Sequence, residues 1–163
     1  MFRCRRPIVG WPNPLPRRPS PRAAGLLILL ALPLATHPAE PLDALLAQGT
    51  RHFQRREFEA ALAVFESAER LSPEDERPPL WTGRAAGRLA ETASPLTAYR
   101  LARRTLQAFE RAYALNPRNV DVLDDLIEFH EKAPRFIGGR PALAAQLRER
   151  RAQLQAETSD ATP

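Results

Sequence analysis

The nine residues Phe65-Glu-Ser-Ala-Glu-Arg-Leu-Ser-Pro73 return later in the chain as Phe109-Glu-Arg-Ala-Tyr-Ala-Leu-Asn-Pro117. Phe, Glu, Ala, Leu and Pro hold the same places in both copies. A shared sequence of this kind indicates one supersecondary unit that is used twice. From Pro41 onward, apolar residues recur at spacings of three and four, which places them on one face of a helix. The sequence therefore predicts an all-α fold built from repeats.

The repeated unit extends upstream of the first copy. It reads Leu45-x2-Gln48-Gly49-x2-His52, then Ala61-x3-Phe65-x2-Ala68 and Pro73. This pattern resembles the tetratricopeptide repeat (TPR), a pair of helices of about 34 residues with the form W-x2-L-G-x2-Y…A-x3-F…P. The resemblance implies a short right-handed α-solenoid of about three helix pairs, similar to small exported bacterial members of the family. It also implies a scaffold that binds a protein or peptide partner in a concave groove.

Three repeats account for most of an expected domain over residues 40–157. They cover 42–75, 76–119 and, in a degenerate form, 120–157, and residues 158–163 are expected to be a disordered tail. Gly49 and Gly83 lie 34 residues apart, whereas Phe65 and Phe109 lie 44 apart. Ten residues are therefore inserted near 87–96, either in the turn between two helices or in the helices beside it.

Turn and cap signals set the expected helix ends. Helices are predicted at about 42–55, 58–71, 95–115, 120–132 and 141–156, and Pro78-Pro79 opens a further one. Ser94 before Pro95 predicts an N-cap, and Asn116-Pro117-Arg118-Asn119 predicts a turn that ends in another. We expect Gly49 to allow a close approach of the partner helix, because glycine has no side chain. This approach comes at a cost of about 1 kcal/mol in helix propensity.

The first 39 residues differ in composition from the rest. Residues 1–22 hold six arginines and no acidic residue, and residues 23–35 form an apolar run of 13. A helix needs about 20 residues to cross a bilayer, so this run is short. The pattern predicts a signal peptide over 1–39 and a secreted or periplasmic bacterial protein. In the alternative, 23–35 stays uncleaved and anchors an accessory subunit of an envelope assembly in the inner membrane.

Removal of residues 1–39 changes the charge of the protein. The whole chain has 24 basic and 19 acidic residues, or +5, and loss of six arginines leaves 18 basic against 19 acidic, or −1. Nucleic-acid binding requires a basic patch on the folded domain, so the net charge of the precursor gives no ground for it. Arg100, Arg103, Arg104 and Arg111 are expected on a solvated convex face, with no membrane contact after signal removal, and contact with anionic lipid or nucleic acid is the alternative.

The family frame also assigns the positions that face the groove. The candidate partner-binding residues are Leu46, Thr50, Phe53, Arg77, Arg84, Arg88, Asp121, Asp124 and Glu128. The middle leading helix is basic on this face and the third is acidic, so Arg84 and Arg88 have an alternative role as ion-pair partners of Glu128 and Asp124. Phe53 and Trp81 are aromatic candidates for a ligand contact, with core packing as the alternative.

The sequence offers no arrangement of residues for catalysis. His130-Glu131 lacks the second histidine that a zinc-binding helix needs four residues after the first. Gly138-Gly139 is not followed by the Lys-Ser/Thr of a phosphate-binding loop. We therefore expect no enzyme, no cofactor and no metal. Phe136 and Ile137, which precede the two glycines, are expected to fold onto the core. The alternative is a binding loop, because two glycines allow the close approach of another backbone.

Overall fold

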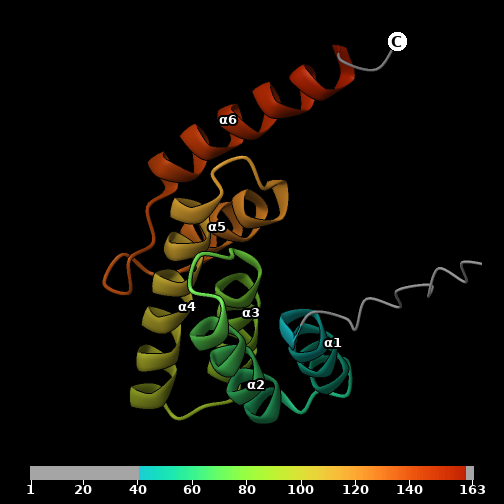
Figure 1. The fold of residues 1–163 in the computed structure, drawn as a ribbon. Coiled ribbons are helices and arrows are strands. Elements are labelled where there is room, and N and C mark those ends of the chain that lie inside the picture. Colours follow the sequence, from blue (N-terminus) through green and yellow to red (C-terminus); the bar gives the residue numbers. More distant parts are fainter. Residues whose placement is uncertain (1–40, 161–163) are drawn as a thin grey trace, which may run out of the picture. The chain divides into compact units, whose positions relative to one another are not determined.

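The structure, a computed structural model, describes residues 41–160 (Figure 1). Every regular element in this range is an α-helix, which confirms that the fold is all-α. The helices are α1 (Pro41–Gln54), α2 (Phe58–Leu71), α3 (Arg77–Ala90), α4 (Pro95–Leu115), α5 (Val120–Lys132) and α6 (Pro141–Asp160). The signal peptide or anchor predicted over 1–39 lies outside the described residues. None of the described helices has the length and apolar character that crossing a membrane requires.

The ends of the helices agree closely with the turn signals. The Asn119 side chain caps α5, because its Oδ1 accepts hydrogen bonds from the backbone N–H groups of Asp121 at 3.0 Å and Val122 at 3.3 Å. Ser94 precedes α4 as expected but makes no side-chain cap. Its hydroxyl instead donates to Oγ1 of Thr97 at 3.1 Å. At the other end of the chain, α6 continues to Asp160, past the predicted end at 156.

The ten inserted residues have become mostly helix. Compared with the first helix pair, α3 runs two residues further past its glycine, and the turn before α4 is one residue longer. The other seven residues extend the start of α4, which has 21 residues where α2 has 14. Residues 95–101 therefore have no counterpart in α2.

A glycine and a phenylalanine meet at the same place in both helix pairs. A Cβ atom at Gly49 would lie 2.7 Å from Cδ1 of Phe65, and one at Gly83 would lie 2.5 Å from Cδ1 of Phe109. Both rings are buried, so neither can move aside without loss of packing. The glycines let α1 approach α2 and α3 approach α4 closely, as expected for Gly49.

The core consists of two clusters that meet at α3. One contains residues of α1, α2 and α3, with Phe65 at its centre, and the other joins Leu80 of α3 to residues of α4, α5 and α6. Each helix packs against the next in the chain, and α1 also packs against α3 (Figure 1). Residues 36–163 form a compact unit by themselves. We therefore expect this unit to fold without residues 1–35.

We expect Gly83→Ala to lower the free energy of unfolding by about 1–3 kcal/mol, since the new methyl group overlaps the buried ring of Phe109. Gly87→Ala on the same helix is the matched control. Its Cβ would lie 3.6 Å from Oγ1 of Thr105, an ordinary contact, so the better helix propensity of Ala should raise stability by up to about 1 kcal/mol. Urea unfolding of both variants measures the difference. Equal effects would contradict the close approach at Gly83.

Candidate functional site

A pocket of about 850 Å³ lies between α3, α4, α5 and the loop 133–140. Its walls are largely apolar. The lining residues include Gly87, Ala98, Tyr99, Ala102, Phe129 and Phe136. The volume falls within the range of about 300–1,000 Å³ that is usual for ligand pockets. The pocket can therefore take several apolar side chains of a peptide.

The extension of α4 builds one wall of this pocket. Pro95, Ala98 and Tyr99 all line it and all lie in the seven added residues. Ala98 and Ala102 are four residues apart, so their methyl groups share one helix face and leave space in front of them. Opposite them, Gly87 of α3 adds no side chain at all. The small side chains on both helices keep the pocket open.

The loop 133–140 forms the outer wall. Gly138 has a φ of +126°, which favours glycine, and a Cβ there would lie 2.6 Å from Cδ2 of Leu106. Nη1 of Arg103 donates a hydrogen bond to the Ile137 carbonyl at 3.1 Å. The Phe136 ring is stacked beside the Tyr99 ring, with centroids 6.5 Å apart. These contacts hold the loop against α4.

The expectation that Phe136 folds onto the core is wrong. This side chain is 73% exposed, whereas Ile137 is half-buried. The reason is the length of α4, because its added residues bring Tyr99 to the surface beside the loop. Phe136 packs on this exposed ring instead of entering either core cluster.

His130 connects α5 to the same loop. Its side chain is buried, and Nδ1–H donates to the Gly138 carbonyl at 3.2 Å. Burial lowers the pKa of His130 below its usual 6.5, and the Arg140 charge lowers it as well. The hydrogen bond to Gly138 and the Glu110 charge oppose this decrease. The fold therefore favours the neutral imidazole.

The charged groups that line the pocket are paired with one another. Nε of Arg84 on α3 lies 2.5 Å from Oδ2 of Asp125 on α5. Nη1 of Arg88 lies 2.8 Å from Oε1 of Glu91, and Nζ of Lys132 lies 2.6 Å from Oε1 of Glu128. Because each cation has a carboxylate partner, the lining carries little uncompensated charge.

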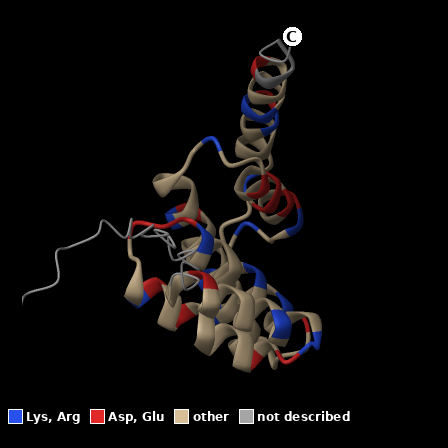
Figure 2. Cartoon of the chain, turned by 45° about the vertical axis from the view of Figure 1, so that its right-hand side comes forward, with Lys and Arg blue, Asp and Glu red and all other residues tan. Residues whose placement is uncertain are grey.

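The Arg84–Asp125 pair crosses from one helix to another and is partly buried. Burial raises the pKa of Asp125, and the neighbouring Arg84 charge and its hydrogen bond lower it. The Arg84 guanidinium also lies 5.0 Å from the ring centre of Trp81. Arg84 is thus fixed by a carboxylate on α5, the most acidic helix (Figure 2), and by an aromatic ring on its own helix.

The predicted ion pairs are half right about the helices and wrong about the residues: Arg84 does pair with α5, but Arg88 pairs with Glu91 at the end of its own helix. Arg84 contacts Asp125, with Asp121 at 3.8 Å, rather than Glu128 or Asp124. Asp124 pairs instead with Arg151 of α6. A step of one residue turns a side chain by about 100° around a helix, which separates the faces of neighbouring residues. The register of α5 therefore directs Asp125 to α3 and Asp124 to α6.

The structure brings four of the nine groove candidates together in the pocket lining: Phe53, Arg84, Arg88 and Glu128. Leu46 is only 8% exposed and belongs to the core, so it is not available to a partner. The Thr50 hydroxyl donates to the Leu46 carbonyl of its own helix at 2.9 Å.

The remaining candidates lie outside the pocket lining. Nη1 of Arg77 is 2.9 Å from Oδ1 of Asp43, a contact that joins the starts of α3 and α1. Asp124 is held by Arg151, as described above, and Asp121 is exposed beside Arg84.

Trp81 has a packing role in this structure. Its ring is stacked on that of Phe65 with centroids 5.6 Å apart. The Phe53 ring packs against it in a T-shaped arrangement, with centroids 5.5 Å apart. Both Trp81 and Phe53 are half-buried against the first core cluster, as the core alternative predicted. Phe53 has a second role, because it also lines the pocket.

The sequence-based assignment missed the wall from α4. Ala98, Tyr99 and Ala102 were not among its candidates, since the family frame looks for groove residues on leading helices. The difference in spacing between the two repeats was the available signal. It located the insertion but gave no direction for the added side chains.

Comparisons with known proteins identify no family for this chain. A scan against protein-family models finds no match, and a search of curated proteins finds none either. Within residues 41–160, no three His, Cys, Asp or Glu side chains are grouped so that they could hold a metal ion. The TPR resemblance therefore rests on the residues quoted above.

We expect Arg84→Gln to lower the free energy of unfolding by about 1–3 kcal/mol at neutral pH, because it leaves the Asp125 carboxylate partly buried without its cation. Arg88→Gln is the matched control on the same helix. Arg88 is exposed, pairs with Glu91 at the helix end and lies 5.7 Å from the ring centre of Phe58, so a loss of at most about 1 kcal/mol is expected. Urea unfolding at one pH compares the two. A similar loss in both would show that the Arg84 pair has no special role.

We also expect the stability of the protein to decrease as the pH falls below about 6.5. In the unfolded chain His130 takes up a proton near its usual pKa, whereas the folded protein resists protonation. As the pH falls, the unfolded state therefore binds more protons than the folded state, and the folded state loses stability. This loss ends once the pH lies below the lowered pKa of His130 in the folded state. Urea midpoints measured between pH 7.5 and 5 provide the test.

His130→Asn should weaken this pH dependence, because an amide can still donate to the Gly138 carbonyl and does not titrate. The control is His52→Asn at the half-buried His52, whose Nδ1 lies 2.6 Å from Oε2 of Glu57. This variant should retain the decrease that depends on His130. If the decrease disappears in His52→Asn and persists in His130→Asn, the assignment to His130 is wrong.

Proposed function

We propose that the chain is an exported TPR-type scaffold that binds a segment of a partner protein in the pocket of α3, α4 and α5. Its six helices would form three tetratricopeptide-type pairs in a short right-handed solenoid. The repeated Gly–Phe contact supports this arrangement, because it gives the two helix pairs the same close packing. Contact between α1 and α3 supports it as well, since alternate helices lie side by side in such stacks.

One observation carries the functional proposal: the pocket lining is largely apolar, and its charged side chains are already paired with one another. A charged or strongly polar ligand would have to compete with Arg84–Asp125 and the two exposed pairs. Apolar side chains, in contrast, would displace water from Ala98, Ala102 and Phe129 without disturbing those pairs. The favoured ligand is therefore a peptide segment with bulky apolar side chains, which act as anchors in such grooves.

The proposed location is outside the cytoplasm, in the periplasm or the surrounding medium of a bacterium. It depends on the signal-peptide pattern of residues 1–39. The alternative is a membrane-tethered accessory subunit in which residues 23–35 remain as the anchor. Sequencing the N-terminus of the exported protein separates the two, since cleavage after Ala39 leaves Glu40 first.

The pocket can be filled without changing the charge of the protein. In Ala98→Phe the new ring enters the pocket, and we expect a fall of at least about tenfold in the affinity of the partner segment. Ala114→Phe is the matched control, because Ala114 is exposed on the same helix outside the pocket. The immobilised 36–163 unit of each protein would first be used to capture partners from native extract. Affinities would then be measured on a synthetic segment of the captured protein.

Support requires a segment that the original protein and Ala114→Phe bind equally and Ala98→Phe binds poorly. A segment bound equally by all three would refute the pocket as the binding site. Capture of nothing specific by a cooperatively folded domain would count against the scaffold role itself. Circular dichroism and urea unfolding check that each variant is folded.

A further inference from the structure

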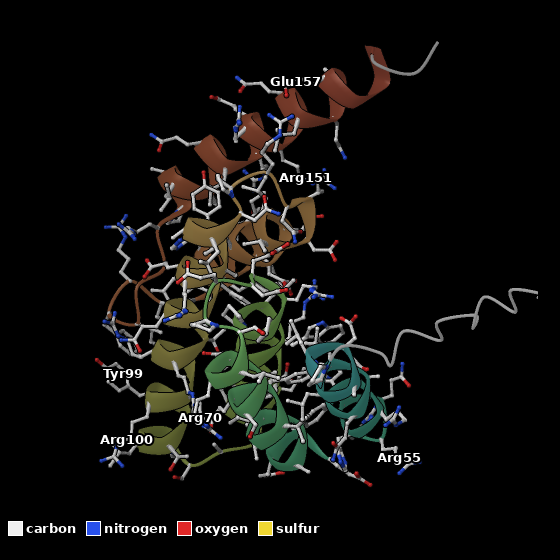
Figure 3. All side chains as sticks on the ribbon, viewed as in Figure 1. Arg55, Arg70, Tyr99, Arg100, Arg151 and Glu157 are labelled. Carbon is white, nitrogen blue, oxygen red and sulfur yellow. The ribbon has the colours of Figure 1, made fainter. Side chains whose placement is uncertain are left out.

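A second surface lies beside the pocket, on the outer side of α4 and the loop. Four large apolar side chains are strongly exposed among the described residues, and three of them are gathered here. Leu96 is 63% exposed, Phe136 73% and Tyr99 41%. We call this set the α4 patch. Tyr99 points away from the other helices on the same side as Arg100 (Figure 3).

The α4 patch is surrounded by positive charge. Neither residues 95–109 nor residues 133–148 contain an acidic residue. Arg100 and Arg135 are exposed and have no carboxylate partner among the described residues. Arg103 bonds to the Ile137 carbonyl, which leaves its charge uncompensated. The start of α4 adds the partial positive charge of a helix N-terminus.

Nearby carboxylates do not neutralise this charge. Glu66 is paired with Arg104, and Oε1 of Glu110 lies 3.5 Å from Nη2 of Arg140. The patch therefore has three unneutralised arginines next to three exposed apolar side chains. The pocket lining differs, since its cations are paired. The two surfaces suit different ligands, although Tyr99 and Phe136 belong to both.

The positive charge of the α4 patch excludes two possible binding partners: a second copy of the protein and residues 1–39 of the same chain. A second copy docked on the same patch would bring two sets of these arginines together and would be repelled. Residues 1–39 contain six arginines and no acidic residue, so they are repelled as well. The occupant must instead be anionic and must also accept apolar side chains.

We propose that the α4 patch binds the surface of an anionic lipid bilayer. Phosphate groups of the lipids would contact Arg100, Arg103 and Arg135, because cations near such a surface are attracted to its negative potential. Leu96 and Phe136 would enter the boundary between headgroups and acyl chains, and Tyr99 suits that depth since one end of it is apolar and the other polar.

Two features of the patch favour a bilayer over an acidic protein. Its apolar side chains project from the surface, with Leu96 and Phe136 each more than 60% exposed. A bilayer receives projecting side chains at any position, whereas a protein partner needs a matching cavity for each. This binding goes beyond the proposed scaffold function, because it would hold the domain, and the pocket beside the patch, at a membrane. It also revises the expectation of a solvated α4 face without membrane contact.

The test uses the 36–163 unit, which lacks the basic and apolar N-terminal segment that would itself bind lipid. Flotation with vesicles would compare phosphatidylcholine alone and phosphatidylcholine mixed with phosphatidylglycerol. We expect binding to the mixed vesicles at low salt and little to the neutral ones. Arg100→Gln/Arg135→Gln should reduce the partition constant by about tenfold or more, since each arginine contributes about 1 kcal/mol.

Matched variants separate the patch from general charge attraction. Arg51→Gln/Arg55→Gln removes the same charge from exposed arginines at the end of α1 and should have a much smaller effect. Leu96→Ser/Phe136→Ser should reduce binding at unchanged net charge. Leu71→Ser is its control, because Leu71 is 49% exposed on α2 away from the patch. All of these side chains are exposed, so the fold should persist, as urea unfolding would verify.

Three outcomes overturn the proposal. The first is absence of binding to the mixed vesicles by the folded unit. The second is an equal loss in the α1 and α4 arginine variants, which would indicate that any exposed arginine attracts the vesicles, wherever it lies on the surface. The third is binding of soluble polyglutamate without binding of vesicles, which would assign the patch to an acidic protein. None of these outcomes affects the pocket, whose test depends on Ala98→Phe.

Discussion

The close approach of two helices over a glycine is the contact on which the rest of the structure depends. Phe65 packs against Gly49 and Phe109 packs against Gly83, and no larger residue than glycine fits either place without displacing a buried ring. Each contact sets the distance between the helices of one pair. Because α3 belongs to both core clusters, an error in either distance would be transmitted to the other cluster. The pocket depends on this as well, since Gly83 and Phe109 contribute to its lining.

The long helix α4 contributes to two surfaces of the protein, the pocket and the α4 patch. Its added first residues supply Ala98 and Tyr99 to the pocket on one side and Leu96 to the α4 patch on the other. Helices normally bury one apolar stripe and expose the rest. In α4 the stripe continues past the partner helix, so apolar side chains are left at the surface. The loop 133–140 covers part of this excess through the Tyr99–Phe136 stack and the Arg103–Ile137 hydrogen bond.

Electrostatics distinguishes the two surfaces more clearly than shape does. Inside the pocket, arginine and lysine meet carboxylates within 2.5–2.8 Å, so the space they enclose is nearly neutral. On the outer side of α4, no carboxylate of the described residues forms an ion pair with Arg100 or Arg135. A neutral apolar space favours bulky apolar side chains, and a positive apolar rim favours an anionic surface. His130 contacts the loop that borders both surfaces, through its hydrogen bond to the Gly138 carbonyl.

The sequence by itself determined the all-α class, the helix ends within a few residues and the close approach over Gly49, because periodicity, caps and the repeated pattern act over short distances in the chain. That the buried ring of Phe65 fills this approach was shown only by the tertiary structure. It located the insertion and predicted the long helix 95–115, but only the tertiary structure decided which side chains of α4 reach the pocket. The pairing of Arg84 with α5 was predicted with the wrong partner, since the rotation of α5 about its axis is set by packing on α6, and the pairing of Arg88 with α5 was wrong. Phe136 was assigned to the core because the sequence cannot show that Tyr99, 37 residues earlier, reaches the surface beside it. Local chemistry fixed the elements, whereas contacts between distant residues decided which side chains reach the pocket.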